Sequence, residues 1–324
     1  MLYIAESDII EIGTNWRKVF ATIEDVTDAM MIGDFSQPLK PYLRFNDPIN
    51  RIIAMPGYVG GKYNCAGLKW IASFPGNVRK GLARASSIMI LNNAETGAPT
   101  AIINSARLSA IRTAGISGVV IHKYLTDRGL MGTKVRIGII GLGVIGRIHL
   151  DMINSAFPDV IEKVYLYDIA GISLQSVQTT GNLELINCRS WEEVFDNSDI
   201  FITCTVGSTR YINKRTELPS LHLNVSLRDY CAGFMDGVDL MIVDSWEEVC
   251  REGTDIAFMH RDHGLQQADV YTMVDVVCRG LFKNNGGEVV MFNPMGMAVY
   301  DIAIAKYYHD LALAYSVGLK IEKL

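Results

Sequence analysis

The stretch Val135-Arg-Ile-Gly-Ile-Ile-Gly-Leu-Gly-Val-Ile-Gly146 leads from an apolar run into a glycine-rich turn, and apolar residues at helical spacing follow over 148–153. A strand, a GxGxxG turn and a helix in this order form the fingerprint of a dinucleotide-binding fold. Gly141 permits the tight turn, and Gly143 lets the backbone approach a pyrophosphate. Gly146 lets the helix pack closely on the strand. We therefore predict a Rossmann-type domain around this turn.

The next apolar run, Val164-Tyr-Leu-Tyr-Asp168, ends on an acidic residue at the distance of about 20 residues that the fingerprint requires. The Asp168 carboxylate is expected to accept hydrogen bonds from the adenosine ribose hydroxyls. It would repel a 2′-phosphate, and no lysine or arginine follows before Arg189. The sequence therefore favours NAD over NADP as cofactor.

Short apolar runs that alternate with helical or polar segments extend this pattern and predict a parallel sheet covered on both faces. They are Val135–Ile140, Val164–Tyr167, Ile200–Thr205, Leu223–Leu227 and Leu240–Val243. The part before them predicts a mainly antiparallel sheet with helices. Its expected elements are a helix capped by Asn15, strands at Arg51–Met55 and Ala66–Ser73, a hairpin of Ser87–Leu91 with Thr100–Asn104, and a helix at Leu108–Leu125.

The tail carries an apolar helical stripe over 304–315, which must dock on another element, and we place it on the N-terminal part. The expected class is α/β, with a Rossmann-type domain beside an α+β domain. The expected domains are residues 116–298 for the Rossmann-type NAD-binding domain and 1–115 with 299–324 for the other.

Composition limits the partners. Of 324 residues, 49% are hydrophobic and 20% are charged, and the net charge is −5, so neither nucleic acid nor an anionic membrane is an expected partner. The six cysteines form no CxxC pair, which predicts reduced thiols and no metal site. The first residues do not resemble a signal peptide, and no apolar run reaches the roughly 18 residues of a membrane span. A cytoplasmic protein is expected.

Few residues of the first part carry chemistry. Arg112 lies within a helix of small and apolar residues, where a cation is costly unless it is paired. Together with Arg44 and Lys69 it would suit carboxylate groups, although each cation could also be a solvated or structural one. Asp229 follows the predicted strand Leu223–Leu227, so its carboxylate could serve as a general base, or form an Asx turn or helix cap.

These residues resemble the ornithine cyclodeaminase/mu-crystallin family over nearly the whole chain. The segments that carry the resemblance are Lys69, Arg112-Thr-Ala-Gly-Ile-Ser117, the glycine-rich turn, Asp229 and Gly296-Met-Ala-Val-Tyr-Asp301. Longer strings resemble the branch of this family that makes 2,3-diaminopropionate for siderophores or peptide natural products. They are Asp34–Arg44, Arg51–Pro56 and Asn293–Ala298.

The resemblance implies a role for each matching residue. The catalytic residues would be Lys69 and Asp229, and the substrate-binding residues would be Arg44, Met55, Lys69 and Arg112. The cofactor-binding residues would be Thr113, Gly141, Gly143, Val144, Ile145, Gly146, Asp168, Thr203, Thr205, Val206, Ser226, Met295 and Gly296. It also implies that the first domain binds substrate and forms a homodimer.

The implied activity is NAD-dependent oxidation and hydrolysis of N-(2-amino-2-carboxyethyl)-L-glutamate to 2-oxoglutarate and 2,3-diaminopropionate. The alternatives are an ornithine cyclodeaminase, a ketimine or imino-acid reductase, and a mu-crystallin-like ligand-binding protein. Two segments depart from the family pattern, Asn93-Ala-Glu-Thr-Gly97 and Tyr230-Cys-Ala-Gly-Phe234. The second replaces a Pro-Gly-Lys-x-Glu run of cyclodeaminases, which favours the dehydrogenase.

Overall fold

The computed structural model describes residues 1–173, 183–207, 209–214, 220–286 and 288–322. The chain divides into two compact units, residues 1–115 with 296–324 and residues 116–295. The second boundary therefore lies between Met295 and Gly296, three residues before the one expected from the sequence. Helix α3 (Ala106–Asp127) contributes residues to both units.

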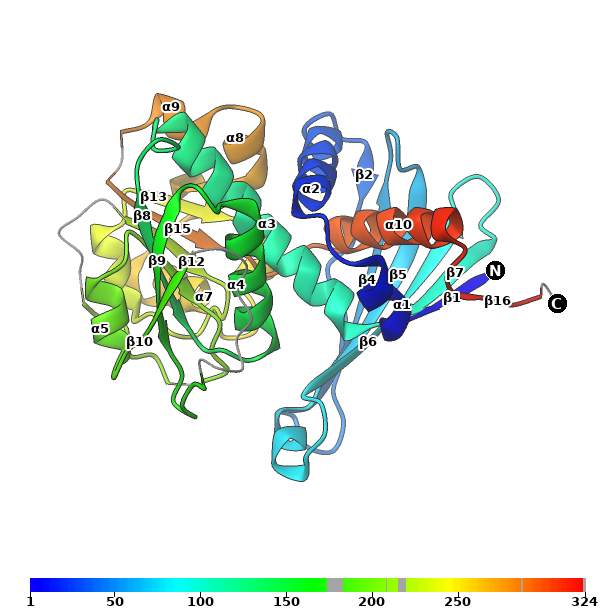
Figure 1. Ribbon diagram of the computed structural model, residues 1–324, viewed down its shortest axis with the longest axis horizontal. Coiled ribbons are helices and arrows are strands. Elements are labelled where there is room, and N and C mark those ends of the chain that lie inside the picture. The colour runs from blue at the N-terminus through cyan, green and yellow to red at the C-terminus, as the bar shows by residue number, and fades with distance from the viewer. Residues whose placement is uncertain (174–182, 208, 215–219, 287, 323–324) are drawn as a thin grey trace. The chain divides into compact units, whose positions relative to one another are not determined.

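The first unit is built on an eight-stranded sheet (Figure 1). Its strands are β1 (Leu2–Ala5), β2 (Phe35–Ser36), β3 (Tyr42–Leu43), β4 (Arg51–Val59), β5 (Cys65–Ser73), β6 (Ala85–Asn93), β7 (Pro99–Asn104) and β16 (Leu319–Lys320). Their order is β16-β1-β7-β6-β5-β4-β2, and β3 also pairs with β4. Only the β1–β7 pair among them is parallel. The predicted antiparallel sheet is confirmed.

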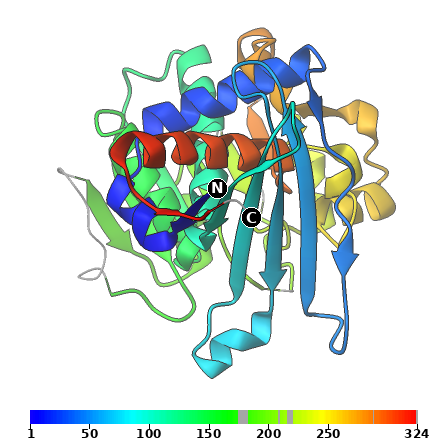
Figure 2. The same cartoon turned by 90° about the vertical axis from the view of Figure 1, so that its right-hand side faces the viewer.

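Helices cover one face of this sheet. They are α1 (Glu6–Ile12), α2 (Trp16–Met31) and α10 (Ala298–Tyr315), and a 3-10 helix, η1 (Pro75–Lys80), follows β5. The Asn15 side chain caps α2 by accepting a hydrogen bond from Lys18 N at 3.2 Å. The C-terminal helix α10 packs on β4, β5 and α2, as Figure 2 shows. The predicted docking of the tail on the N-terminal part is confirmed.

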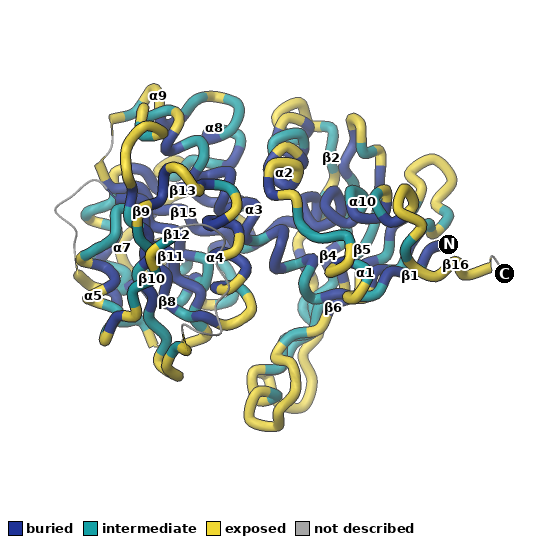
Figure 3. Tube along the Cα trace, viewed as in Figure 1, coloured by how far each residue is buried: buried dark blue, intermediate teal, exposed yellow. Residues whose placement is uncertain are grey.

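The second unit is built on a parallel sheet of eight strands. They are β8 (Val135–Ile140), β9 (Ile161–Tyr167), β10 (Glu184–Asn187), β11 (Ile200–Thr203), β12 (Ser220–Asn224), β13 (Leu240–Val243), β14 (Val270–Thr272) and β15 (Val289–Asn293). The helices are α4 (Val144–Ala156), α5 (Trp191–Asp196), α6 (Trp246–Val249), α7 (Asp255–His263), α8 (Met273–Val277), α9 (Leu281–Asn284), η3 (Ala232–Gly237) and η4 (Gln267–Asp269). The central strands are buried along their length (Figure 3), which confirms the predicted Rossmann-type class.

The strand order β10-β9-β8-β11-β12-β15-β13-β14 reverses direction at β8. From β8 the chain first adds β9 and β10 on one side and later adds β11 on the other. Such a switch point leaves room for a ligand at the carboxyl ends of the two central strands. The glycine-rich turn follows β8, and the segment Cys204–Gly207 follows β11, so both lie at this point.

Two predicted strand ends are wrong. The run Ile200–Thr205 was expected to be strand to its end, but β11 ends at Thr203. The apolar run Leu223–Leu227 was expected to be strand throughout, but β12 ends at Asn224. Leu227 is buried in a turn and has a φ of 61°, a left-handed conformation that no strand allows. Asp229 therefore lies on a turn five residues beyond the strand.

Among the described residues, no helix is both long and apolar enough to cross a membrane.

Candidate functional site

A cavity of about 490 Å³ lies in the second unit at the switch point. Its lining combines the glycine-rich turn, the end of β9 and the segment after β11. The lining residues that matter below are Gly141, Gly143, Asp168, Trp191, Thr205 and Tyr211. The cavity is thus formed by the carboxyl ends of adjacent parallel strands, where Rossmann-type domains hold a dinucleotide.

Each glycine of the turn meets a different steric demand. Gly141 has a φ of 86°, and a Cβ there would lie 2.7 Å from the carbonyl carbon of Cys204. A Cβ on Gly146 would lie 2.0 Å from the carbonyl oxygen of Gly141. A Cβ on Gly143 would meet nothing within 4 Å, yet Gly143 lines the cavity and caps the 13-residue helix α4. The space beside Gly143 therefore suits a diphosphate at a helix N-terminus.

Asp168 connects the end of β9 to the glycine-rich turn. Its Oδ2 accepts a hydrogen bond from Leu142 N at 2.6 Å, and its Oδ1 accepts one from Ala170 N at 2.9 Å. The carboxylate also lines the cavity, and none of the described lining residues is a lysine or arginine. A carboxylate in a lining that holds no lysine or arginine suits the free ribose hydroxyls of NAD and disfavours the 2′-phosphate of NADP.

The other residues assigned to the cofactor lie in varied places. Val206 lines the cavity beside Thr205, Val144 is exposed on the first turn of α4, and the Ile145 carbonyl contacts His149 Nδ1 at 2.8 Å. The hydroxyl groups of Thr203 and Ser226 form a hydrogen bond of 2.7 Å.

The remaining three assigned residues are bonded within their own units. Met295 N donates to Asp244 Oδ1 at 3.0 Å in the second unit. In the first unit, the Gly296 carbonyl accepts from Lys40 Nζ at 2.7 Å, and the Thr113 hydroxyl donates to the Ser109 carbonyl at 2.8 Å.

A buried ionic cluster forms the chemical centre of the first unit. Lys69 Nζ and Arg112 Nε both donate to Oδ1 of Asp301, each at 3.0 Å, and Lys69 Nζ also donates to Ser109 Oγ at 2.8 Å. The side chains of Lys69 and Arg112 are 2% and 7% exposed, and that of Asp301 is fully buried. Oδ2 of Asp301 has no hydrogen-bond partner among the described residues. Two cations thus share one oxygen of one carboxylate.

Burial and charge act against each other in this cluster. The pKa of Lys69 is lowered to about 8, mainly by burial and also by the charges of Arg112 and Lys40, while the adjacent Asp301 raises it. Burial also raises the pKa of Asp301, but Arg112 and Lys69 outweigh this effect and hold it below its ordinary value. The carboxylate is therefore charged at neutral pH, and the three groups carry one net positive charge. An anionic group would be stabilised there.

The other substrate-binding assignments fall in two places. Met55 is buried and pairs directly with Lys69 across β4 and β5, so both side chains lie on the sheet face that α10 covers. Arg44 is exposed, donates to the Pro48 carbonyl at 3.1 Å and lies over the Tyr42 ring at 5.5 Å. The structure thus brings Met55 to the ionic cluster and places Arg44 on the strand-end loop after β3.

Asp229 is a fully buried carboxylate in the second unit that is bonded to hydroxyl groups. Its Oδ1 accepts from the Thr205 hydroxyl at 2.5 Å, and its Oδ2 accepts from the Ser226 hydroxyl. Burial and then the charge of Asp229 raise the pKa of Tyr211 above its ordinary range. Since Thr205 and Tyr211 line the cavity, Asp229 contacts the cavity through them.

Three residues of these arrangements were not predicted. Asp301 is the single acid in the apolar run 298–305, and that isolation was a signal for a buried cationic partner. Lys40 is buried, although its sequence neighbours Leu39 and Pro41 indicate an ordinary loop. Asp255, whose Oδ2 accepts from Asp229 N at 3.0 Å, follows Thr254, whose side chain caps α7, so the sequence indicates only a helix start.

The model of the ornithine cyclodeaminase/mu-crystallin family matches residues 3–316 of the chain. The N-((2S)-2-amino-2-carboxyethyl)-L-glutamate dehydrogenase of Staphylococcus aureus is 32% identical, over 99% of this chain and 98% of that protein. A Delta(1)-pyrroline-2-carboxylate reductase of Bacillus cereus is 26% identical, over 97% of this chain and 100% of that protein.

Solved structures share the fold over the full length. The Thermococcus litoralis Delta(1)-pyrroline-2-carboxylate reductase, in complex with NADH and L-proline, matches with a TM-score of 0.85 at 24% identity, over 99% of this chain and 100% of that one. An archaeal alanine dehydrogenase dimer with bound NAD matches with a TM-score of 0.81 at 23% identity, over 100% and 99%. With a family match over almost all of its residues, the chain belongs to the ornithine cyclodeaminase/mu-crystallin family.

Proposed function

We propose that this chain is an NAD-dependent oxidoreductase that acts on a carbon–nitrogen bond of N-(2-amino-2-carboxyethyl)-L-glutamate. The glutamyl Cα–N bond is oxidised to an imine, and water then hydrolyses the imine. The substrate, NAD⁺ and water would give 2-oxoglutarate, L-2,3-diaminopropionate, NADH and a proton. The 32% identity to the Staphylococcus aureus dehydrogenase, over almost all of both chains, supports this substrate.

The observation that carries the proposal is the pair of buried cations on one oxygen of Asp301. Their net positive charge suits a substrate carboxylate, and the planar guanidinium of Arg112 suits two-point binding of it. Lys69 would add a charged hydrogen bond to the same substrate or assist a proton transfer. We also propose that Arg44 binds a further carboxylate, in keeping with its exposed position.

The cavity of the second unit supports NAD as cofactor. Gly141, Gly143 and Gly146 form the turn that would hold the pyrophosphate, and Asp168 would accept hydrogen bonds from the ribose. Bound NAD would supply the hydride acceptor, which is the one redox component that the protein's own residues lack. The protein's contribution is to bind, to orient and to move protons.

Asp229 would act as the base of the hydrolytic step. Its carboxylate would take a proton from the attacking water, directly or through the hydroxyls of Thr205 and Ser226 that donate to it. These hydroxyls hold the two carboxylate oxygens in fixed positions. Once protonated, Asp229 could return the proton to the departing amine, as a base and acid in one reaction does.

The runner-up is a reductase of a cyclic imino acid, which would run the redox step in the opposite direction. The Bacillus cereus relative and the Thermococcus litoralis fold neighbour both carry that name. Such a substrate has one carboxylate, so the buried cluster would suit it as well. An ornithine cyclodeaminase or a non-enzymatic ligand-binding protein is the further alternative.

We further propose that the chain works in the cytoplasm as a homodimer and supplies 2,3-diaminopropionate for a siderophore or peptide natural product. The dimeric archaeal alanine dehydrogenase supports the dimer. The name of the Staphylococcus aureus relative supports the diamine product, since its substrate contains that diamine.

The test is NADH formation by the purified protein with N-(2-amino-2-carboxyethyl)-L-glutamate, compared with ornithine and with alanine as alternative substrates in separate assays. We expect turnover with the conjugate and release of 2-oxoglutarate in equal amount to NADH. In Asp229→Asn the rate should fall by about 10²–10⁴-fold, the usual contribution of a positioned base. NAD should bind at least tenfold tighter than NADP, because of Asp168. NADPH-dependent reduction of a cyclic imine, without oxidation of the conjugate, would replace the proposal with the runner-up.

A further inference from the structure

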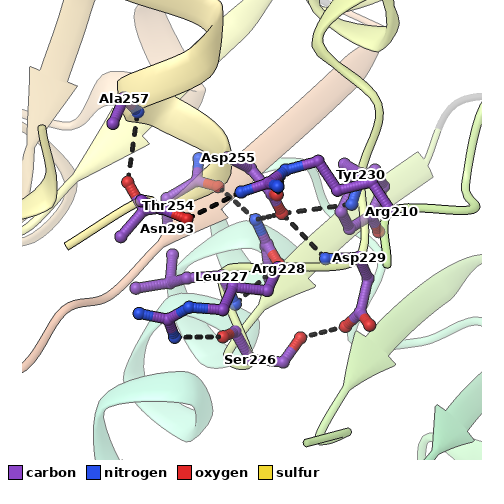
Figure 4. A network of polar contacts seen from close by, with 12 residues as sticks. Arg210, Ser226, Leu227, Arg228, Asp229, Tyr230, Thr254, Asp255, Ala257 and Asn293 are labelled. Atoms are coloured by element: carbon purple, nitrogen blue, oxygen red, sulfur yellow. Dashed lines mark hydrogen bonds and ion pairs between the residues drawn. The ribbon is translucent and has the colours of Figure 1, made fainter. Parts of the chain in front are cut away.

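The turn that carries Asp229 is held by a second buried carboxylate, that of Asp255 (Figure 4). Oδ2 of Asp255 accepts hydrogen bonds from Asp229 N at 3.0 Å and Tyr230 N at 3.1 Å, and from Asn224 Nδ2 at 3.1 Å. Asn224 is the last residue of β12, and Asp255 is the first of α7. One oxygen therefore fixes the turn to the strand before it and to the helix beyond it.

The other oxygen of Asp255 is held by Arg210, from the segment that follows β11. Arg210 Nε donates to Oδ1 at 2.7 Å, its terminal nitrogen donates to the Gly253 carbonyl at 2.7 Å, and its guanidinium lies 3.9 Å over the Phe258 ring. The segment after β11 also supplies Thr205, whose hydroxyl donates to Asp229. Asp255 thus connects both pieces of chain that meet at the Asp229 carboxylate.

Backbone contacts reinforce this connection. The amides of Tyr211 and Ile212 both donate to the Asp229 carbonyl at 2.9 Å. If the two segments moved relative to each other, the Thr205 hydroxyl and the Asp229 carboxylate would separate, and the Asp229 side chain would lose its fixed orientation. The Asp229 backbone is therefore held through its N–H by Asp255 and through its carbonyl by the segment that Arg210 anchors.

We propose that Asp255 is a positioning residue for Asp229, which it holds in its reactive orientation through the turn amides on one side and Arg210 on the other. The proposal rests on the base role of Asp229 given above. In this proposal, Asp255 itself contacts neither substrate nor cofactor. All four donors that face Asp255 are N–H groups, so only an ionised carboxylate accepts from all of them.

The substitution Asp255→Asn keeps the shape and turns one acceptor oxygen into an N–H donor. That donor must face either Arg210 or the turn amides, so one side of the connection is lost. We expect kcat to fall by about 10- to 100-fold, the effect of a displacement of about 1 Å at a catalytic group. NAD affinity should fall by a smaller factor than kcat, because the glycine-rich turn makes no bond to Asp255, although the segment after β11 that Arg210 holds also lines the cavity.

A double-mutant cycle tests whether Asp255 acts through Asp229. In Asp229→Asn the base is already absent, so adding Asp255→Asn should cost less than about threefold more. A purely structural role predicts multiplied losses instead. If Asp255→Asn does not fold, Arg210→Lys serves in the same cycle, because it keeps the charge and loses the forked contact to Asp255 and Gly253.

A control with the same pattern of amide bonds, on an exposed carboxylate, is available in the same unit. Oδ2 of Asp239 also accepts from two consecutive amides, Glu288 N at 2.7 Å and Val289 N at 2.9 Å. Asp239→Asn should leave kcat within about twofold of wild type. Amide hydrogen exchange over 226–231 should accelerate at least tenfold in Asp255→Asn and stay unchanged in Asp239→Asn, a result that needs no turnover.

The outcomes separate the two proposals. If Asp229→Asn keeps nearly full activity, the base assignment fails, and the role of Asp255 fails with it. If Asp229→Asn loses activity but the Asp255→Asn loss multiplies with it, only the positioning role is overturned. Unchanged exchange over 226–231 in Asp255→Asn also overturns it. A strong loss in Asp255→Asn, absent in the Asp229→Asn background, supports it.

Discussion

At the scale of single residues, the contacts of Arg112 with Asp301 and Gly296 decide what it can bind. Its Nε is occupied by Asp301. A Cβ at position 296 would lie 3.0 Å from a terminal nitrogen of Arg112, so the glycine there leaves room beside that nitrogen. Arg112→Lys keeps the charge but loses the planar fork, so we expect kcat/KM to fall by about 10- to 100-fold. Steady-state NADH formation measures it.

The control for this substitution is Arg136→Lys. Arg136 makes a forked contact to Asp199, with distances of 3.1 Å and 2.8 Å, between side chains that are each 35% exposed. We expect its activity to remain within about twofold of wild type, because exposed pairs contribute little. Equal kcat/KM for Arg112→Lys and wild type would make Arg112 a structural cation.

Lys69 gives the site a pH dependence. Its pKa is lowered to about 8, first by burial, so the ammonium is charged below that pH and neutral above it. A neutral amine no longer attracts a carboxylate, so kcat/KM should decline above about pH 8. In Asp301→Asn the charge that raises the Lys69 pKa is gone, while Arg112 and Lys40 still lower it, so the decline should begin at lower pH.

The pH profiles of kcat/KM for wild type and Asp301→Asn measure this effect. An alkaline decline at the same pH in both proteins would assign it to the substrate amine rather than to Lys69. The affinity for NAD over the same range is the control, since the residues assigned to its pyrophosphate and ribose, Gly141, Gly143, Gly146 and Asp168, lie in the second unit.

At the scale of elements, the turn between β8 and α4 offers two glycines with opposite steric surroundings. A Cβ on Gly143 meets no protein atom within 4 Å, but a Cβ on Gly146 lies 2.0 Å from the Gly141 carbonyl oxygen. We expect Gly143→Ala to lower the thermal midpoint only slightly, because alanine is a poorer helix N-cap than glycine, and to weaken NAD binding at least tenfold, because its methyl group occupies the cavity. Gly146→Ala should lower the midpoint further, since the helix must shift from the strand.

Calorimetric unfolding and NAD titration of both variants give the measurement. Unchanged NAD affinity in Gly143→Ala would mean that the pyrophosphate does not approach this turn. Both variants add one methyl group, at positions three residues apart. A difference in their thermal midpoints or NAD affinities therefore comes from the position of that group.

Elements were predictable from the sequence where local pattern and final environment agree. The β8 run and its glycines carry both signals, and α2 begins at its Asn15 cap as predicted. The end of β12 was wrong, because the apolar Leu227 is buried in a turn rather than in a strand. Asp301 lies far along the chain from its partners Lys69 and Arg112. Asp255 likewise lies far from its partner Arg210. Local pattern can indicate that an isolated charge such as Asp301 needs a partner, but it does not identify that partner.

At the scale of the whole molecule, the first unit presents an unusual sheet face. Residues paired across neighbouring strands lie on one face. One row across five strands is Tyr3, Ile102, Ile90, Leu68 and Pro56, and the next includes Asn104, Ile88, Trp70 and Ala54. Neither row contains a charged residue. The helix α10 covers the opposite face, on which Lys69 and Met55 are buried.

This face bears on the proposed homodimer. Trp70 and Ile88 are direct neighbours across β5 and β6, and they are 41% and 40% exposed. A row of apolar side chains on an uncharged sheet face is typical of a protein–protein interface, because contact removes its apolar surface from water. Two copies that join through this face would form an interface between identical surfaces, the commonest arrangement of homodimers.

Trp70→Glu tests this interface, because it places a charge at the centre of the face without touching the side of the sheet that α10 covers. Light scattering coupled to size-exclusion chromatography should give a dimer for wild type and a monomer for the variant, with the dimer dissociation constant raised at least about 100-fold, as expected for burial of an unpaired charge. Leu313→Glu is the control, since Leu313 is an equally apolar residue on α10 that is 52% exposed. That variant should remain dimeric. A wild-type monomer at micromolar concentration, or a dimer that survives Trp70→Glu, would show that this apolar face does not join two copies of the chain.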